Sequence, residues 1–292
     1  MYPCTSFFPA RRAVVAAALT LPLVLAGCSV PTPVINSAPA ANAFGHVHGI
    51  SVDPASTRIL LATHDGLYDA TKKTAVRVSD TIDLMGFTVT DDPKIFYASG
   101  HPGAGSSLPN PVGLIRSTDA GKTWQELSLG GESDFHALTA SGGGLVAFDG
   151  QLRTSHDGVT WENSTTTFTP AVLAGSPAST VVLATTESGV QRSTNAGKTW
   201  QLVPNSPIIQ FAAFATSLEK APTETVGVSP DGSVHVSTDA GLSWAMAGKV
   251  AGQVEAIAAL EGSHGKPRIW VATTTGISVS DDGGETFHTA AS

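Results

Sequence analysis

Cysteine is scarce in this chain, and no hydrophobic run is long enough for a comfortable transmembrane helix. The 292 residues include two cysteines, Cys4 and Cys28, both close to the N-terminus. Residues 44–292 therefore cannot be held by disulfides, and their stability must come from packed secondary structure. The apolar run from Ala13 to Ala26 is too short to span a bilayer comfortably.

Basic residues are also few. The chain has 16 Lys and Arg against 24 Asp and Glu, and two of the basic residues, Arg11 and Arg12, precede Cys28. The remainder has 14 basic and 24 acidic residues, a formal charge of −10. This charge argues against nucleic acid as a partner. It leaves cations, neutral sugars and other proteins as candidate ligands.

The first 28 residues have the pattern of an export signal. Arg11 and Arg12 precede the apolar run, and the segment ends in Leu25-Ala26-Gly27-Cys28. This ending resembles a bacterial lipobox, which implies a signal peptide over 1–27, a lipid on Cys28 and an extracytoplasmic location at the cell membrane. The Pro/Ala-rich residues 28–43 are expected to be a tether. An ordinary secretory signal cut elsewhere is the alternative.

One short phrase recurs five times in the rest of the chain. It contains Ser, then Asp or Asn, Gly, Thr or Ser, and finally Trp or Phe. The copies are spaced by 38, 38, 44 and 43 residues and begin at Ser117, Ser155, Ser193, Ser237 and Ser280. Asp or Asn can cap backbone N–H groups while Gly supplies a positive φ, so each copy predicts a tight turn.

The pattern Ser-x-Asp-x-Gly-x-Thr-Trp resembles the Asp-box, or bacterial neuraminidase repeat, of sialidase-like, sortilin-like and photosystem-assembly propellers. The resemblance implies a hairpin between the two outer strands of a four-stranded blade, and a period near 40 residues suits a propeller blade. One blade cannot bury both of its faces, so the blades must stack. The box is a structural element and says little about chemistry.

Six segments rich in β-branched residues indicate the second strand of each blade. They are Arg58–Ala62, Lys94–Ala98, Leu145–Ala147, Thr180–Ala184, Thr225–Val228 and Arg268–Ala272. We therefore expect an all-β fold, a six-bladed β-propeller of four-stranded blades over residues 44–292. Seven blades of about 35 residues are the alternative.

Aligning the innermost strands reveals two polar columns. The first column holds His46, Asp83, Asp134, Thr169, Gln210 and Gln253, and the second holds His48, Met85, His136, Ala171, Ala212 and Glu255. Residues two apart on a strand face the same way, so the columns should line the axial channel or the blade interface beside it. His64 and His101 occupy turns predicted at the same face, opposite the Asp-boxes.

Imidazole, thioether and carboxylate groups at one cavity suit a transition metal, with copper favoured and zinc next. The candidate ligands are His46, His48, Met85, His136, His64 and His101. We expect Asp83, Asp134 and Glu255 to orient the imidazoles, and we expect no nucleotide cofactor. The alternative is that these side chains only solvate the channel and that Met85 fills the core.

A glycoside hydrolase is the rival prediction, because it needs two carboxylates across the scissile bond. Asp83, Asp134, Glu187 and Glu255 are the candidates. A sialidase also needs an arginine cluster and a tyrosine nucleophile. Arg116, Arg153 and Arg192 instead each precede a box, and residues 44–292 contain two tyrosines, Tyr68 and Tyr97.

A protein-binding scaffold, like the sortilin-like and photosystem-assembly propellers, is the third possibility. The chain has no G-x-S-x-G elbow, so a nucleophilic hydrolase is not supported. The favoured prediction is a lipid-anchored propeller that binds a metal ion, or another small ligand, at the face opposite the Asp-boxes.

Overall fold

The structure is a computed structural model that describes residues 45–166 and 168–290. All of these residues belong to one unit, Pro39–Ser292. The predicted signal peptide, Cys28 and the tether lie outside them. The described part is all-β, as predicted, apart from one 3₁₀ helix, η1 (Ser263–Gly265). No helix in this part of the chain is long and apolar enough to cross a membrane.

Antiparallel runs of four strands, each pairing with the next along the chain, make up the fold. The first sheet consists of β1 (Val47–Val52), β2 (Ile59–Thr63), β3 (Gly66–Asp69) and β4 (Val76–Arg77). The second consists of β5 (Ile82–Val89), β6 (Phe96–Pro102), β7 (Leu114–Ser117) and β8 (Gln125–Ser128). The third consists of β9 (Ala137–Ser141), β10 (Gly144–Phe148), β11 (Leu152–Ser155) and β12 (Glu162–Asn163). The fourth consists of β13 (Val172–Ser176), β14 (Ser179–Thr186), β15 (Gly189–Ser193) and β16 (Gln201–Leu202).

The remaining strands form one eight-stranded sheet made of two such runs. The first run is β17 (Phe211–Thr216), β18 (Thr225–Val228), β19 (Ser233–Ser237) and β20 (Ala245–Lys249). The second run is β21 (Val254–Leu260), β22 (Arg268–Thr273), β23 (Gly276–Ser280) and β24 (His288–Thr289). β17 and β21 join the runs in parallel, through Ala215 with Ala259 and Thr216 with Leu260.

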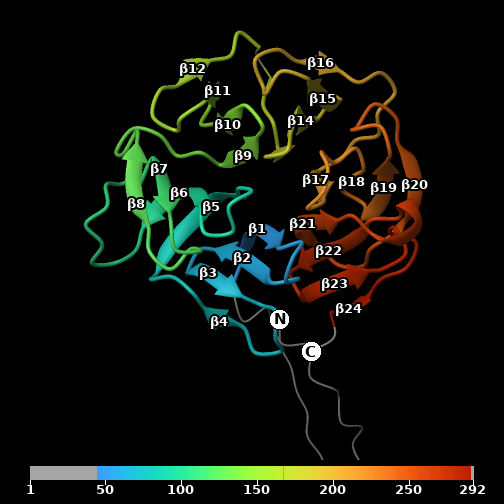
Figure 1. The fold of residues 1–292 in the computed structure, drawn as a ribbon, viewed down its shortest axis with the longest axis horizontal. Coiled ribbons are helices and arrows are strands. Elements are labelled where there is room, and N and C mark those ends of the chain that lie inside the picture. Colours follow the sequence, from blue (N-terminus) through green and yellow to red (C-terminus); the bar gives the residue numbers. More distant parts are fainter. Residues whose placement is uncertain (1–44, 167, 291–292) are drawn as a thin grey trace, which may run out of the picture. The chain divides into compact units, whose positions relative to one another are not determined.

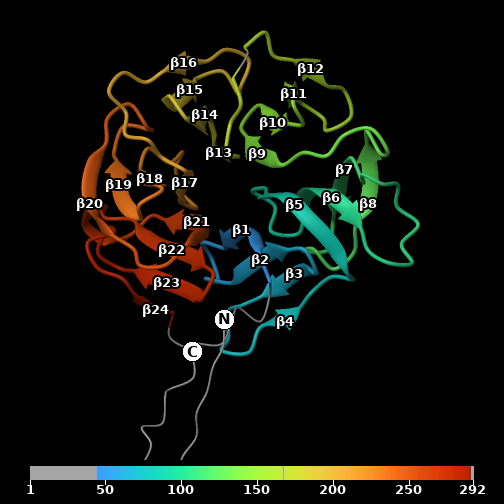
Figure 2. The same ribbon diagram turned by 180° about the vertical axis from the view of Figure 1, so that it is seen from behind.

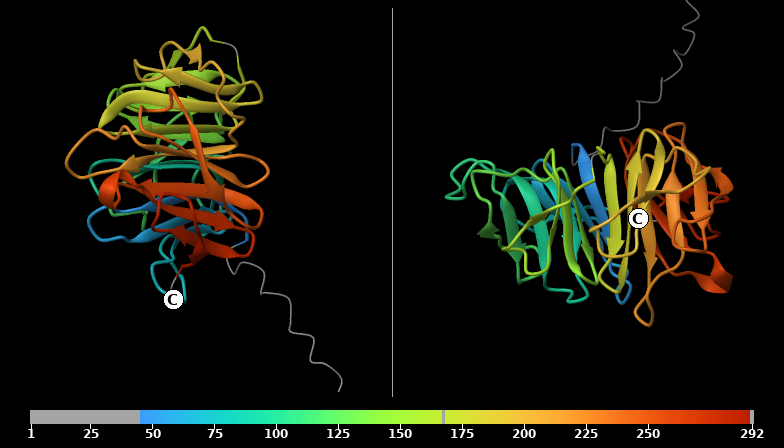
Figure 3. Two further views of the ribbon diagram at one scale, coloured as in Figure 1. Left: turned by 90° about the vertical axis from the view of Figure 1, so that its right-hand side faces the viewer. Right: turned by 90° about the horizontal axis from the view of Figure 1, so that it is seen from above.

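The sheets are arranged around a common axis with their first strands innermost, as Figure 1 and the reverse view in Figure 2 show. Contacts run from β1 to β5, β9, β13, β17 and β21 in turn, and β21 contacts β1. The first strands therefore form a closed ring. The side views in Figure 3 show the sheets stacked face to face.

Apolar side chains fill the space between neighbouring sheets. The second strands contribute Leu61, Leu183 and Ile269, none of which is exposed to solvent. Leu67 in β3 and Ile115 in β7 belong to one buried cluster that joins the first two sheets. Burial of such a side chain contributes about 1.5–3 kcal/mol. The second strands are buried almost continuously, so both of their faces gain from the stacking of sheets.

Each repeated phrase forms the turn between the third and fourth strands of a run. In the first copy, the Ser117 hydroxyl donates to Asp119 Oδ1 (2.8 Å) and accepts the N–H of Gly121 (2.8 Å). Asp119 accepts the N–H and the hydroxyl of Thr123 at 2.9 and 2.7 Å. The same pattern recurs around Asp157, Asp239 and Asp282. Around Asn195 it differs in one bond, because the amide Nδ2 donates to the Thr199 hydroxyl at 3.0 Å. These turns set the period of the fold.

Candidate metal centre

Polar residues flank a buried apolar residue near the start of three first strands. Val47, Leu84 and Phe135 are at most 1% exposed. The register of pairing shifts next to two of them, between Val47 and Gly49 in β1 and between Leu84 and Gly86 in β5, so simple alternation does not describe this part of the strands. The flanking residues form three pairs, His46 with His48, Asp83 with Met85, and Asp134 with His136.

The third pair, Asp134 with His136, lies before its strand and not within it. We expected the innermost strand to begin at Asp134, whereas β9 begins at Ala137. The Phe135 N–H donates to the buried hydroxyl of Ser99 at 2.9 Å, and the Phe135 ring packs on Trp161 with centroids 4.8 Å apart. The segment before β9 is thus fixed by its contacts with β6 and with its own sheet.

A cavity of about 920 Å³ lies between the first strands. Polar residues from several sheets line one end of it, namely His46, His48, Met85, His136, Gln210, Gln253 and Glu255. Most residues of the two aligned columns therefore face the same space. Ligand pockets for small molecules commonly have volumes of about 300–1,000 Å³.

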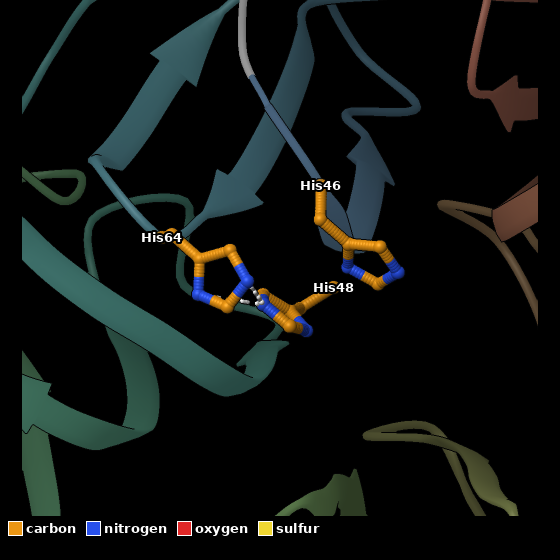
Figure 4. Close-up of side chains that lie close together, drawn as sticks. All are labelled: His46, His48 and His64. Carbon is orange, nitrogen blue, oxygen red and sulfur yellow. Dashed lines mark hydrogen bonds between the residues drawn. The ribbon is translucent and has the colours of Figure 1, made fainter.

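Three imidazoles converge at this end of the cavity, as Figure 4 shows. His46 precedes β1, His48 lies in β1, and His64 lies in the turn between β2 and β3. The turn reaches β1 because Val47 pairs with Thr63. One nitrogen from each histidine lies within 4.8 Å of the other two. His48 Nε2 lies 3.3 Å from Nδ1 and 3.2 Å from Nε2 of His64.

A carboxylate from the next sheet orients His64. Asp83 Oδ1 lies 2.9 Å from His64 Nδ1 and 3.9 Å from His48 Nε2. A carboxylate oxygen accepts hydrogen bonds, so Nδ1–H of His64 donates to it and Nε2 keeps its lone pair. His48 Nε2 lies beside both ring nitrogens of His64, at 3.3 Å from Nδ1 and 3.2 Å from Nε2. A carboxylate behind a ligating imidazole is the common arrangement in metal sites, where it fixes the tautomer and raises the basicity of the ligand.

A second, buried carboxylate supports the other side of the cluster. The side chain of Glu255, which is 4% exposed, places Oε1 3.9 Å from His46 Nε2. Its Oε2 accepts the Val47 N–H at 3.3 Å. Glu255 thus connects β21 to the beginning of β1 and places negative charge beside the cluster.

His48 is the most enclosed of the three imidazoles, with a side chain 11% exposed. Burial, followed by the proximity of His64 and His46, lowers the pKa of His48 from 6.5 to about 4, although Asp83 opposes this shift. The ring is therefore neutral at neutral pH. Neutral imidazole is the form that binds metals.

The other candidate ligands lie outside this triad. His136 and His101 each contact Asp134 Oδ2 through Nε2, at 3.2 and 3.3 Å. Met85 is half-buried and lines the cavity. Asn110 was not among the predicted site residues, and its Oδ1 accepts a hydrogen bond from His101 Nδ1 at 2.8 Å. Its position in the Gly/Ser/Pro-rich segment after His101 was the available signal.

The candidate catalytic carboxylates have different surroundings. Asp83, Asp134 and Glu255 each lie within 4.0 Å of at least one imidazole. Glu187 is exposed in the turn between β14 and β15. Three arginines considered for substrate binding lie in three different sheets, in β7, β11 and β15, namely Arg116, Arg153 and Arg192.

Similarity to known proteins is found at the level of the fold. No protein-family model matches the chain, and no curated protein matches it. An ancestral GH74 enzyme superposes with a TM-score of 0.53 at 15% identity, covering 86% of this chain and 39% of that one. The fold is a β-propeller. The four-stranded sheets described above are blades of this propeller.

Two further β-propellers are similar at lower scores. YCF48 bound to D1 peptide gives a TM-score of 0.44 at 17% identity, covering 69% of this chain and 64% of YCF48. The WD40 domain of Neurospora crassa Pan2 gives 0.49 at 13% identity, covering 78% of this chain and 72% of that domain. The chain thus spans less than two thirds of YCF48 and of the GH74 enzyme, and these likenesses concern the propeller fold alone.

Proposed function

We propose that this propeller binds a transition metal ion, copper or zinc, through His46, His48 and His64. The convergence of three imidazoles within 4.8 Å is the observation that carries the proposal. Zinc sites with three protein ligands leave a further position for water or an exogenous ligand. In this chain that position would open toward the axial cavity.

The spacing of the nitrogen atoms supports a shared ion. A tetrahedral ion with bonds of about 2.0–2.1 Å holds its ligand atoms about 3.3–3.4 Å apart. His48 Nε2 and His64 Nε2 are separated by 3.2 Å. The carboxylate of Asp83 holds His64 in the tautomer in which Nε2 keeps its lone pair and can bind an ion.

We also infer six blades and Asp-box repeats. Four sheets have four strands each, and the eight-stranded sheet divides into two antiparallel runs that share only a short parallel contact. The five repeated turns have the hydrogen bonds expected of an Asp-box. A blade count of six also agrees with the ring of first strands.

We propose that Cys28 carries a lipid and that the domain lies on the extracytoplasmic side of the membrane. The support is the sequence Leu25-Ala26-Gly27-Cys28 after an apolar run. Cys28→Ser should release the protein from the membrane fraction and abolish incorporation of labelled palmitate. Retention and labelling of this variant would contradict a lipid on Cys28.

Metal titration of the full chain in detergent tests the site. Cys4→Ser and Cys28→Ser should be present in every protein, so that thiolates do not compete for copper. We expect His46→Ala/His48→Ala/His64→Ala to lose a high-affinity ion measured by calorimetry and by metal analysis. The matched control is His156→Ala/His235→Ala/His288→Ala, which removes three histidines elsewhere and should retain the ion. Equal binding by both triple variants would refute the proposed site.

A further inference from the structure

A second group of imidazoles surrounds one carboxylate near the start of β9. We call His101, Asn110, Asp134 and His136 the Asp134 cluster. His101 comes from the end of β6, Asn110 from the loop before β7, and the other two from the segment preceding β9. Nε2 of His101 and Nε2 of His136 lie 3.3 and 3.2 Å from the same oxygen, Asp134 Oδ2.

Asn110 determines which nitrogen of His101 faces the carboxylate. Its amide oxygen lies 2.8 Å from His101 Nδ1, and an amide oxygen can only accept. Nδ1–H of His101 therefore donates to Asn110, and in the neutral ring Nε2 carries a lone pair. This Nε2 lies 3.3 Å from Asp134 Oδ2, which is also an acceptor. Two acceptors at 3.3 Å are stabilised only by positive charge between them, either a proton or a metal cation.

Asp134 has unused capacity to bind a cation. Its Oδ1 is buried and has no hydrogen-bond partner, while the whole side chain is 18% exposed. Among residues 45–166 and 168–290, no lysine or arginine forms an ion pair with it. A carboxylate oxygen buried without a partner is unfavourable, and a bound cation would compensate it.

We propose that the Asp134 cluster is a second, separate site for a divalent first-row transition metal. Its ligands are His101 Nε2, His136 Nε2 and a carboxylate oxygen of Asp134, with water completing the coordination. Two histidines and one carboxylate with open positions form a known donor set for such ions. The 3.3 Å separation of His101 Nε2 and Asp134 Oδ2 equals that of two ligands of a tetrahedral ion with bonds of about 2.0–2.1 Å.

The second site is less preorganised than the first. The nitrogens of the first triad lie within 4.8 Å of one another, whereas His101 and His136 approach from two different segments and each contacts Asp134, at 3.3 and 3.2 Å. The side chain of His136 is 60% exposed, so it must be fixed in place when the ion binds. Fixing an exposed side chain costs entropy, so the second ion binds more weakly than the first.

Zinc stoichiometry distinguishes the two sites. In the full chain carrying Cys4→Ser and Cys28→Ser, we expect two zinc ions per chain. His101→Ala/Asp134→Asn should bind one ion and retain the tighter affinity, and His46→Ala/His48→Ala/His64→Ala should bind one ion with the weaker affinity. Combining the five substitutions should abolish binding. The control His156→Ala/His235→Ala/His288→Ala should bind two.

The outcomes separate this proposal from that of the first site. If His101→Ala/Asp134→Asn binds as many ions as the parent protein, the second site is refuted and the first is unaffected. If the parent protein binds one ion and the substitutions at His46, His48 and His64 leave it in place, the first site fails instead. Circular dichroism must show that each variant is folded.

Histidine resonances provide a test that does not depend on removing a ligand. In zinc titrations of labelled protein, the second equivalent of zinc should shift the side-chain resonances of His101 and His136.

The Asn110→Ala variant tests the tautomer of His101. It should weaken the affinity for the second ion about 10–100-fold, because Nδ1–H of His101 loses its acceptor, and it should leave the affinity for the first ion unchanged. Unshifted His101 resonances at saturating zinc would overturn the proposal.

Discussion

Asp83 Oδ1 lies 2.9 Å from His64 Nδ1, and this contact joins the second blade to the turn between β2 and β3 of the first. The contact fixes the tautomer of His64, so that Nε2 keeps its lone pair. The three-histidine cluster is therefore a property of two blades together, although all three of its histidines belong to the first.

Removal of the Asp83 carboxylate should weaken metal binding without abolishing it. We expect Asp83→Ala to lower the affinity of the first site about 10–100-fold, because the orientation and basicity of His64 depend on this contact. Asp83→Asn keeps an acceptor and should lose less. Calorimetric titration with zinc measures both effects.

The matched control is Asp65→Ala, which removes an exposed carboxylate adjacent to His64 in sequence. If Asp65→Ala and Asp83→Ala weaken binding equally, the effect is a general loss of negative charge. Asp83 would then have no special role in orienting His64.

The carboxylates of the repeated turns should make the free energy of unfolding depend on pH in the acid range. Hydrogen bonds from the backbone N–H and the hydroxyl of Thr123 lower the pKa of Asp119 from 3.8 to about 2. A lowered carboxyl pKa contributes stability that is present above pH 3.8 and lost as the pH falls toward 2. Asp119→Asn should therefore lose less stability than wild type over this range. The losses of unfolding free energy of wild type and Asp119→Asn over this pH range should differ by at most about 1 kcal/mol, because the carboxyl group is exposed.

Asn195 provides the converse experiment, since the third repeat has an amide where the others have a carboxylate. Asn195→Asp should make unfolding more sensitive to acid between about pH 4 and about pH 2. Urea unfolding at a series of pH values measures both substitutions. Parallel stability curves for wild type and both variants would show that these turns do not contribute to acid unfolding.

Titration of the metal-free protein should find His48 neutral well into the acid range. Burial and the neighbouring imidazoles lower its pKa from 6.5 to about 4. The folded state thus binds fewer protons than the unfolded state between these values, so stability falls as the pH drops from 6.5 toward 4. Histidine NMR signals measure the midpoint, with the urea-unfolded chain as reference. A midpoint near 6.5 in the folded protein would contradict the burial of this ring.

Two equivalent glycines should respond differently to an added methyl group. A Cβ on Gly86 in β5 would meet the carbonyl oxygen of Phe135 at 2.3 Å, whereas one on Gly49 in β1 would have its nearest neighbour, in Phe87, at 3.5 Å. Gly86→Ala should cost about 1–3 kcal/mol through overpacking. Gly49→Ala should change stability by no more than about 0.5 kcal/mol. Urea midpoints measure both, and equal costs would contradict the close approach of the third blade to β5.

Strand order and turn positions could be predicted from the sequence because both depend on local chemistry. The strand predicted at Thr225–Val228 coincides with β18, and that at Arg268–Ala272 with β22. The Ser-x-Asp-x-Gly phrase carries all the groups that its turn needs. The start of β9 was predicted three residues too early, because contacts of Phe135 with Ser99 and Trp161 hold this segment outside the strand.

The repeat, the all-β class and the grouping of histidines near the start of the first strands are all local features of the sequence. The contacts between the histidines come from packing of the blades, which brings His64 to His46 and His48, and places His136 and His101 at Asp134. Metal ligands must meet within a few ångströms, and separations on that scale depend on the twist and packing of neighbouring blades, which no local pattern specifies.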